Sequence, residues 1–364
     1  MSKTRLIFVG GFLGAGKTTL LYEATRIFME EGKRVGLVTN DQAPELVDSA
    51  ILLQTRAEVE EVSGSCFCCN YNGLMSSLQK INLQSGADVI IAEPVGSCTD
   101  LSATIMQPFK DLHKQDFLLS PLTVLVDPYR LKEMLSGNTG GLHPSASYIL
   151  EKQMEESDII VISKSDLLQE DELRLLIQQV SAYFPDSEVM ALSSRTGQGI
   201  REWIQKVREH SKIGSRLIQV DYDRYAEGEA VLGWLNASVS MAGNGVDWDR
   251  HLTALMNSLA EAFDKENLSV GHVKVILKNG VQSLAGNLTG KSSTLLLRGS
   301  AGISDHAELI INARVETLPS RLAEIVQRSM QSAFANSLQY EILAWKCLSP
   351  GYPSPTYRYN KVVG

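Results

Sequence analysis

The hydrophobic pattern divides the chain into two regions, the first of which extends to about residue 210. In this region, short and almost continuously apolar runs alternate with stretches of helical spacing. Continuous apolar runs are typical of parallel strands that are covered on both faces. Strands are predicted at residues 5–10, 34–39, 88–93, 122–127, 158–163 and 188–192, helices at 17–32 and 171–184, and a flexible loop at 137–147. This alternation predicts an α/β fold with a doubly wound, mostly parallel sheet.

From about residue 215 the pattern indicates a second, smaller α+β domain. Helical spacing and strand-like runs alternate in the order β-α-β-β-β-α-β, which indicates a mainly antiparallel sheet. The helices are predicted at 248–263 and 319–334, and the strands at 229–241, 271–280, 293–299, 307–315 and 339–347. We therefore predict one domain over 1–212 and a second over 213–364, the latter ending in an irregular, Pro-rich stretch at 349–360.

Composition and charge narrow the function classes. The 364 residues are 44% hydrophobic and 21% charged, as in ordinary globular proteins. The net charge of −8 argues against nucleic acid or an anionic membrane as the main partner. No apolar stretch approaches the length of a membrane span, and the N-terminus lacks a signal-peptide pattern. We expect a cytoplasmic protein whose thiols stay reduced.

The stretch "GFLGAGKT", residues 11–18, fits the phosphate-binding pattern G-x-x-x-x-G-K-[ST] completely. It follows a predicted strand and precedes a predicted helix, which is the context that this motif requires. Backbone N–H groups and the helix N-terminus would face the phosphates, Lys17 would reach the β- and γ-phosphates, and Thr18 would ligate Mg²⁺. The residues predicted to bind nucleotide here are Gly11, Gly14, Ala15, Gly16, Lys17, Thr18 and Thr19.

The base is predicted from a second motif. Strand 158–163 leads into "SKSD", where GTPases place [N/T]-K-x-D. In such a motif the carboxylate, here Asp166, accepts hydrogen bonds from the N1–H and 2-amino groups of guanine. Lys164 fits the same pattern, and Ser194 follows the next strand, in the next base-contact loop. These residues predict guanine specificity, although a charged surface turn would read similarly.

Hydrolysis requires a carboxylate linked to magnesium and a group that contacts the γ-phosphate. Strand 88–93 ends in "EPVG", which offers Glu93 as the carboxylate and the N–H of Gly96 for the γ-phosphate. Strand 34–39 is followed by "NDQ", which offers Asp41 as a second carboxylate. Carboxylates at strand ends can simply cap turns, but two on neighbouring strands beside a phosphate loop favour a role in hydrolysis, with Lys17 as the third charged catalytic group.

Cysteines concentrate in one short loop. Cys66, Cys68 and Cys69 are three of only five cysteines in the chain. Thiolates are soft ligands that suit Zn²⁺ and other late transition metals, and three ligands from one loop suit an open or exchangeable site. We predict that the loop is exposed and bends so that all three thiols converge. Cys98 could add a fourth thiolate in one nucleotide state, although a lone cysteine is more often a small buried residue, as Cys347 is expected to be.

The phosphate loop, the C-x-C-C triplet, the E-x-x-G segment and the "SKSD" motif together resemble the CobW-type GTPases, relatives of the hydrogenase and urease nickel-insertion GTPases. The resemblance implies that Cys66, Cys68 and Cys69 bind a cargo metal, Zn²⁺ or Co²⁺, in a cycle of GTP and GDP with Mg²⁺. It also implies a client metalloenzyme or corrinoid protein as partner, and a nucleotide-dependent homodimer as an assembly to test.

The chain departs from the family pattern at several positions. Asn40-Asp41 replaces the usual Asn-Glu, Ser65 replaces a glycine, and Pro94-Val95 replaces Thr-Thr. The six histidines are scattered singly rather than gathered in a tract, which makes zinc storage less favoured. Two other function classes stay open, namely a small-molecule kinase that uses the same phosphate loop and a non-enzymatic thiol sensor of metal or redox state.

Overall fold

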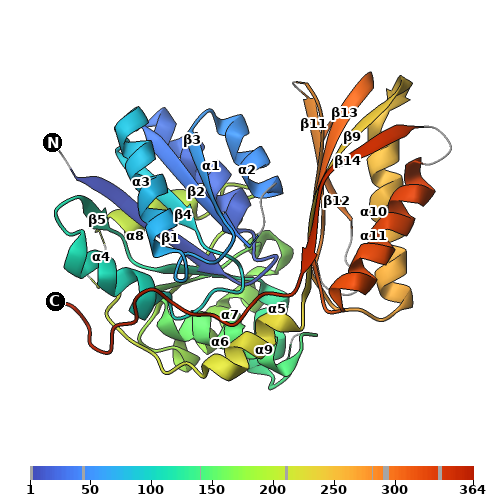
Figure 1. Ribbon diagram of the computed structural model, residues 1–364. Coiled ribbons are helices and arrows are strands. Elements are labelled where there is room, and N and C mark those ends of the chain that lie inside the picture. Colours follow the sequence, from blue (N-terminus) through green and yellow to red (C-terminus); the bar gives the residue numbers. More distant parts are fainter. Residues whose placement is uncertain are drawn as a thin grey trace.

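The computed structural model describes residues 3–42, 46–139, 141–209, 212–280, 282–289, 295–334 and 338–364. These residues form two layered units that lie side by side, with the sheet of the second unit standing between its own helices and the first unit (Figure 1). None of the helices in the described ranges combines the length and the apolar character that crossing a membrane requires.

The first unit contains an eight-stranded sheet in the order β3-β2-β4-β1-β6-β7-β8, with β5 beside β1, and every recorded pair is parallel. Its strands are β1 Thr4–Gly11, β2 Val35–Asp41, β3 Glu58–Ser63, β4 Val89–Glu93, β5 Phe117–Leu119, β6 Thr123–Val126, β7 Ile159–Ile162 and β8 Glu188–Ala191. Alternate residues of β1 belong to two separate apolar clusters, Leu6 and Phe8 to one and Ile7 and Val9 to the other. The sheet is therefore buried on both faces, as the continuous apolar runs predicted.

Helices cover both faces of this sheet (Figure 1). They are α1 Lys17–Glu30, α2 Val47–Leu52, α3 Tyr71–Ser85, α4 Gln107–Leu112, α5 Pro128–Leu135, α6 Pro144–Glu156, α7 Glu170–Tyr183, α8 Ile200–Glu209 and α9 Tyr222–Ala230. The flexible loop predicted at 137–147 is partly wrong, because Pro144 begins α6 and the His143 side chain accepts a hydrogen bond from Ser145 N. Proline at the first helical position is compatible with a helix start.

The second unit is a six-stranded sheet in the order β12-β11-β10-β13-β9-β14, with every recorded pair antiparallel. Its elements are β9 Gly233–Asp247, α10 Trp248–Lys265, β10 Val270–Asn279, β11 Gln282–Leu288, β12 Leu296–Ser300, β13 Ile303–Val315, α11 Pro319–Phe334 and β14 Gln339–Leu348. The sequence missed β11, so the order is β-α-β-β-β-β-α-β. This strand has few apolar residues, although the Asn279-Gly280 pair before it is a recognised hairpin signal. The start of the strand predicted at 293–299 lies outside the described residues.

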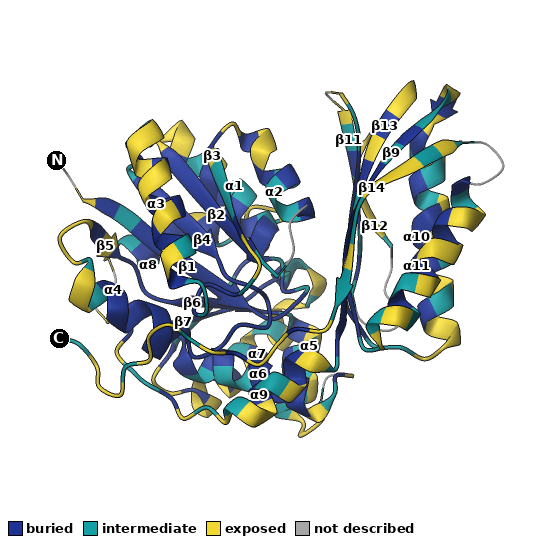
Figure 2. Ribbon diagram, in the orientation of Figure 1, coloured by how far each residue is buried: buried dark blue, intermediate teal, exposed yellow. Residues whose placement is uncertain are grey.

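The two faces of this second sheet have different surroundings. The odd-numbered residues of β10 and β13, such as Val273, Val275 and Ile311, belong to the apolar core shared with α10 and α11. The even-numbered residues face the first unit, where Ile276 packs with Val47 of α2. Buried residues are accordingly found on the sheet, while the outer surfaces of α10 and α11 are exposed (Figure 2).

Two segments after residue 212 pack against the first unit. Helix α9 lies beside α6, and its Tyr225 joins the apolar core of the first sheet. The irregular tail after β14 runs back along the first unit, where Tyr359 N donates to Ala103 O (Figure 1). The division of the chain between 212 and 213 stays a prediction.

Candidate nucleotide and metal sites

The glycine-rich loop has the backbone that its motif predicts. Gly11, Gly14 and Gly16 all have positive φ, a region that L side chains rarely adopt. At Gly11 a Cβ atom would lie 2.2 Å from Leu125 O, so only glycine fits between β1 and β6. Lys17 is buried, and its Nζ donates to Gly11 O at 2.8 Å. Burial lowers the pKa of Lys17, and the ion pair with Glu93 at 3.8 Å opposes this shift.

Carboxylates surround the Thr18 hydroxyl. Thr18 Oγ1 lies 2.7 Å from Asp48 Oδ1 and 3.1 Å from Glu93 Oε2. The sequence predicted Glu93 here but missed Asp48, which α2 brings to the site. Burial, followed by repulsion from Asp48, raises the pKa of Glu93 to about 7. A hydroxyl and two carboxylates form the hard oxygen donor set that Mg²⁺ prefers, so these three residues fit that ion.

Asp41 and Gly96 line the same pocket as Lys17, Asp48 and Glu93. The Oδ2 of Asp41 accepts a hydrogen bond from Arg314 Nη2 at 2.6 Å. A Cβ atom on Gly96 would lie 2.6 Å from Leu13 Cδ2 and 3.2 Å from Lys17 Nζ. The glycine therefore allows its backbone to lie close to the lysine of the phosphate loop.

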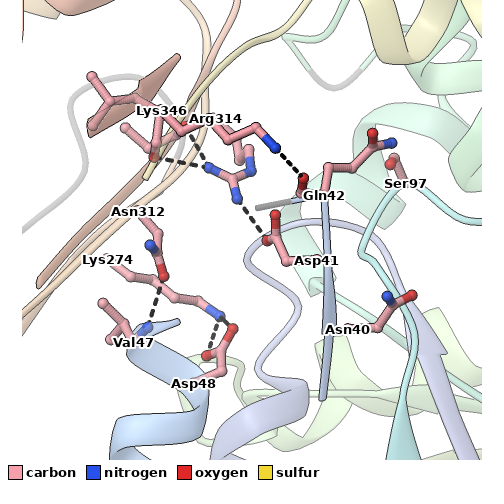
Figure 3. Close-up of polar contacts among 12 residues, drawn as sticks. Asn40, Asp41, Gln42, Val47, Asp48, Ser97, Lys274, Asn312, Arg314 and Lys346 are labelled. Carbon is pink, nitrogen blue, oxygen red and sulfur yellow. Dashed lines mark hydrogen bonds and ion pairs between the residues drawn. The ribbon is translucent and has the colours of Figure 1, made fainter. Parts of the chain in front are cut away.

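The second unit supplies one wall of this pocket (Figure 3). His272 and Lys274 come from β10, and Arg314 comes from β13. Lys274 Nζ lies 2.6 and 2.8 Å from the two Asp48 oxygens and 3.3 Å from Thr18 Oγ1. Sequence reasoning missed these residues. The available signal was strand alternation, which places these polar side chains on the face opposite to α10 and α11.

The residues predicted to contact the base converge at the ends of β7 and β8. Lys164 has φ of 51°, and its Nζ lies 2.8 Å from Asp127 Oδ2. Asp166 accepts a hydrogen bond from Ser193 Oγ and forms an ion pair with Arg195 at 2.7 Å. The predicted Ser194 lies between those two partners in sequence. The structure thus brings the two predicted loops together at one edge of the sheet.

The thiols of Cys66, Cys68 and Cys69 lie within 4.8 Å of one another. The loop bends as predicted, because Cys69 N and Asn70 N both donate to Cys66 O. Cys98 joins them, with its Sγ 3.7 Å from Cys68 Sγ, close to the 3.8 Å between the Sγ atoms of Cys68 and Cys69. Tetrahedral zinc with bonds of about 2.3 Å separates its sulfur ligands by ~3.8 Å. The three thiols of the loop therefore fit a soft metal ion after shifts that separate Cys66 Sγ from Cys68 Sγ, now 2.9 Å apart, and Cys98 lies beside Cys68.

The prediction that this loop is exposed is wrong. Cys66 and Cys68 are 3% and 2% exposed, and Cys69 is partly exposed. The C-terminal tail covers the loop, because Thr356 N donates to Cys68 O at 2.8 Å and Ser354 N donates to Cys69 Sγ at 3.2 Å. No local pattern of residues indicates this contact, since its partners lie far apart in the chain.

The clustered thiols influence one another's ionisation. Hydrogen bonds from the thiols of Cys66 and Cys68 lower the pKa of Cys98 to about 6. The hydrogen bonds that Cys68 makes with Cys66, Cys69 and Cys98, together with burial, raise the pKa of Cys68 well above its usual range. The cluster therefore favours one thiolate, and further ionisation requires an added positive charge such as a metal ion.

Comparison with known proteins matches residues 5–191, about half of the chain, to the family CobW/HypB/UreG, nucleotide-binding domain. The chain is 26% identical over 250 residues to the zinc chaperone YjiA of Escherichia coli (strain K12), covering 61% of this chain and 73% of that protein. It is 24% identical over 211 residues to zinc-regulated GTPase metalloprotein activator 1 of Dictyostelium discoideum, covering 50% of this chain and 44% of the relative. This chain spans about half the length of that relative and of the E. coli zinc chaperone YeiR, of which it covers 47%.

Among solved structures, HypB from Helicobacter pylori in complex with nickel is 16% identical, with 57% of this chain and 89% of that chain covered and a TM-score of 0.41. A likeness at that score adds no argument about function. The family match covers both the glycine-rich loop and the cysteine cluster. The chain therefore belongs to the CobW/HypB/UreG family of P-loop proteins.

Proposed function

We propose that this chain is a GTP-hydrolysing metallochaperone that couples its nucleotide state to the binding and release of a transition metal. One observation supports the coupling, namely that a single short segment contacts both sites. Glu93 lies 3.1 Å from the Thr18 hydroxyl at the phosphate loop, and Cys98, five residues later, lies 3.7 Å from Cys68. A change of this segment at one end would be transmitted to the other.

At the nucleotide end, the glycine-rich loop and Lys17 would bind the phosphates, and Asp166 would accept hydrogen bonds from guanine. Thr18, Asp48 and Glu93 would hold Mg²⁺, which neutralises charge on the β- and γ-phosphates when bound. The N–H of Gly96 would contact the γ-phosphate, because the backbone at Gly96 lies beside Lys17. Loss of the γ-phosphate after hydrolysis would then release segment 93–98.

At the metal end, Cys66, Cys68, Cys69 and Cys98 would bind the cargo ion as thiolates. Four thiolates suit zinc, and the relatives named zinc chaperones favour Zn²⁺ over Co²⁺ as the cargo. A chaperone needs a recipient, so we propose a client metalloprotein as partner. The named activator relative supports such a client, whereas nothing in the geometry favours a corrinoid protein.

The test is anaerobic zinc titration of the protein bound to GDP or to a GTP analogue that cannot be hydrolysed. We expect different zinc affinities in the two states, within the ~5–150-fold range of ordinary allosteric couplings. Cys98→Ala should reduce this difference, whereas Cys347→Ala, a matched cysteine change in β14, should leave it intact. Equal zinc dissociation constants in the two nucleotide states would contradict the proposal.

A further inference from the structure

We propose that Lys274 and Arg314, from the sheet of the second unit, are nucleotide-binding residues that recognise the γ-phosphate. The inference rests on the proposed binding of GTP by the glycine-rich loop. It assigns the second unit a direct part in the nucleotide site, which the family match to residues 5–191 does not include.

Lys274 lies among the oxygen atoms of the residues that fit Mg²⁺. Its ammonium contacts both oxygens of Asp48 and lies 3.3 Å from Thr18 Oγ1, within the oxygen donor set that fits Mg²⁺. The two short contacts form an ion pair between the Lys274 ammonium and the Asp48 carboxylate. The ammonium of Lys274 and a bound Mg²⁺ would thus use the same oxygen atoms.

Lys274 and Mg²⁺ would compete for these oxygens, because two positive charges at the same ligands repel each other. The four-carbon stem of lysine is flexible, so its ammonium could shift to another anion within reach. In a site that binds GTP the γ-phosphate would be such an anion, because Thr18, Asp48 and Glu93 would hold Mg²⁺ beside the β- and γ-phosphates.

Arg314 is held rigidly at the same wall. The side chain is fully buried, its guanidinium carbon lies 4.3 Å from the centre of the Trp234 ring, and Nη1 donates to Leu235 O at 3.0 Å. Nη2 donates to Asp41, which lines the pocket. A planar guanidinium fixed in this way presents its N–H groups in one orientation, which suits recognition of phosphate oxygens.

Buried donors without partners support an anionic ligand. Arg314 Nε and Trp234 Nε1 both carry hydrogens, yet within the described parts of the chain neither finds an acceptor. Both residues line the pocket beside Lys17. Buried unsatisfied donors are costly, and phosphate oxygens would satisfy them.

The same wall holds the segment that carries the carboxylates. Arg314 binds Asp41, Asn312 Oδ1 accepts a hydrogen bond from Val47 N at 2.7 Å, and Lys274 binds Asp48 (Figure 3). Lys274 and Asn312 are opposite each other in the antiparallel ladder, as are His272 and Arg314. Release of Lys274 from Asp48 would therefore remove one of these polar contacts, so the position of the second unit would depend on the nucleotide.

The experiment compares Lys274→Met with the wild type in the full chain. The readout is the ratio of the affinities for a non-hydrolysable GTP analogue and for GDP, both measured with excess Mg²⁺. Without the lysine, Mg²⁺ would have no competitor, so the protein would bind both nucleotides more tightly. The ratio of the two affinities cancels that shared effect. Loss of a γ-phosphate contact should lower the ratio about tenfold or more, which is typical of a hydrogen bond to a charged group.

Lys346→Met is the matched control. Lys346 Nζ also reaches from the second unit to the first, donating to Gln42 O at 3.3 Å, but it does not line the pocket. Its ratio should equal that of the wild type. Arg314→Lys, which keeps the charge but loses the planar fork, should also lower the ratio, and thermal unfolding of each variant checks that it is folded.

An unchanged ratio in Lys274→Met would overturn the role of Lys274, including the case in which both nucleotides simply bind more tightly. An unchanged ratio in folded Arg314→Lys would overturn the role of Arg314. If Lys346→Met lowered the ratio of the two nucleotide affinities as much as Lys274→Met does, the effect would come from weaker packing between the two units, not from a phosphate contact. Failure of the wild type to bind guanine nucleotide would instead overturn the proposed function itself.

Discussion

The nucleotide pocket and the cysteine cluster are both covered by parts of the chain beyond residue 212, but the covers differ in chemistry. A rigid sheet closes the pocket with the charged side chains of Lys274 and Arg314. An irregular tail closes the cysteine cluster with backbone hydrogen bonds from Ser354 and Thr356. The first cover can respond to a change of charge, whereas the second opens only when its hydrogen bonds and packing are broken.

The two sites also differ in the charges of the side chains that line them. The pocket gathers lysine and arginine side chains around three carboxylates, an arrangement that an incoming phosphate and Mg²⁺ can rearrange. Near the thiols lies the buried carboxyl of Glu229, whose pKa burial raises to about 8. Thiol and carboxyl groups gain charge only by becoming anions, and the cluster favours one thiolate, so this site favours a cation over an anion.

The largest expected effect is a loss of nucleotide binding that leaves zinc binding unchanged. Lys17→Ala should abolish tight nucleotide binding, a loss of about a hundredfold or more, because the lysine would contact two phosphates. Zinc affinity without nucleotide should stay unchanged. Fluorescent guanine nucleotide titration and zinc competition measure both quantities, with Lys33→Ala, an exposed lysine beyond the far end of α1, as the control. Normal nucleotide affinity in Lys17→Ala would remove the glycine-rich loop from the site.

The converse change acts on the metal site. Cys68→Ser should weaken zinc binding on the order of a hundredfold, because Cys68 contacts the other three thiols and one ligand in four accounts for about a quarter of the binding free energy. GDP affinity should stay unchanged. Competition with a chromogenic zinc chelator measures the loss, and Cys347→Ser provides the matched control. A zinc affinity within twofold of the wild type would show that the cluster is not the metal site.

A smaller effect concerns the base. Asp166→Asn should lower the preference for GTP over ATP about tenfold, because an amide offers only one acceptor where the carboxylate offers two. Competition binding of the two triphosphates measures this preference. Asp171→Asn, an exposed change in α7, serves as the control. Equal binding of ATP and GTP by the wild type would refute guanine specificity.

The smallest expected effect is on the rate of zinc release, and it tests whether the C-terminal tail covers only the cysteine cluster. A chain ending at residue 349 lacks the tail contacts to Cys68 and Cys69, so zinc transfer to a chelator should accelerate about 3- to 10-fold, as loss of one or two neutral hydrogen bonds predicts. Nucleotide affinity should not change. Stopped-flow absorbance measures the transfer rate. An unchanged rate would mean that the tail does not control access to the thiols.

The sequence by itself determined the features whose residues are close together in the chain. The apolar runs predicted six of the eight strands of the first sheet, because the burial of a central strand on both faces requires consecutive apolar residues. The sequence analysis missed β3, in which charged residues separate the apolar ones, and β5, which has only three residues. The loop 11–18 and the triplet at 66–69 were identifiable for the same reason, since each motif is contiguous and its neighbours fix the local backbone. Strand β11 was not predicted, because it has too few apolar residues to show the alternation on which the prediction depended.

Tertiary structure alone decided which distant side chains meet. Alternation along β10 and β13 shows that Lys274 and Arg314 share a face, but it cannot show what covers that face. Lys274 and Asp48 lie 226 positions apart, and their contact depends on how the two units pack. The approach of Cys98 to Cys68 and the path of the tail over the thiols depend likewise on packing. Contacts of this kind are set by the fit of whole surfaces, which no local pattern of residues records.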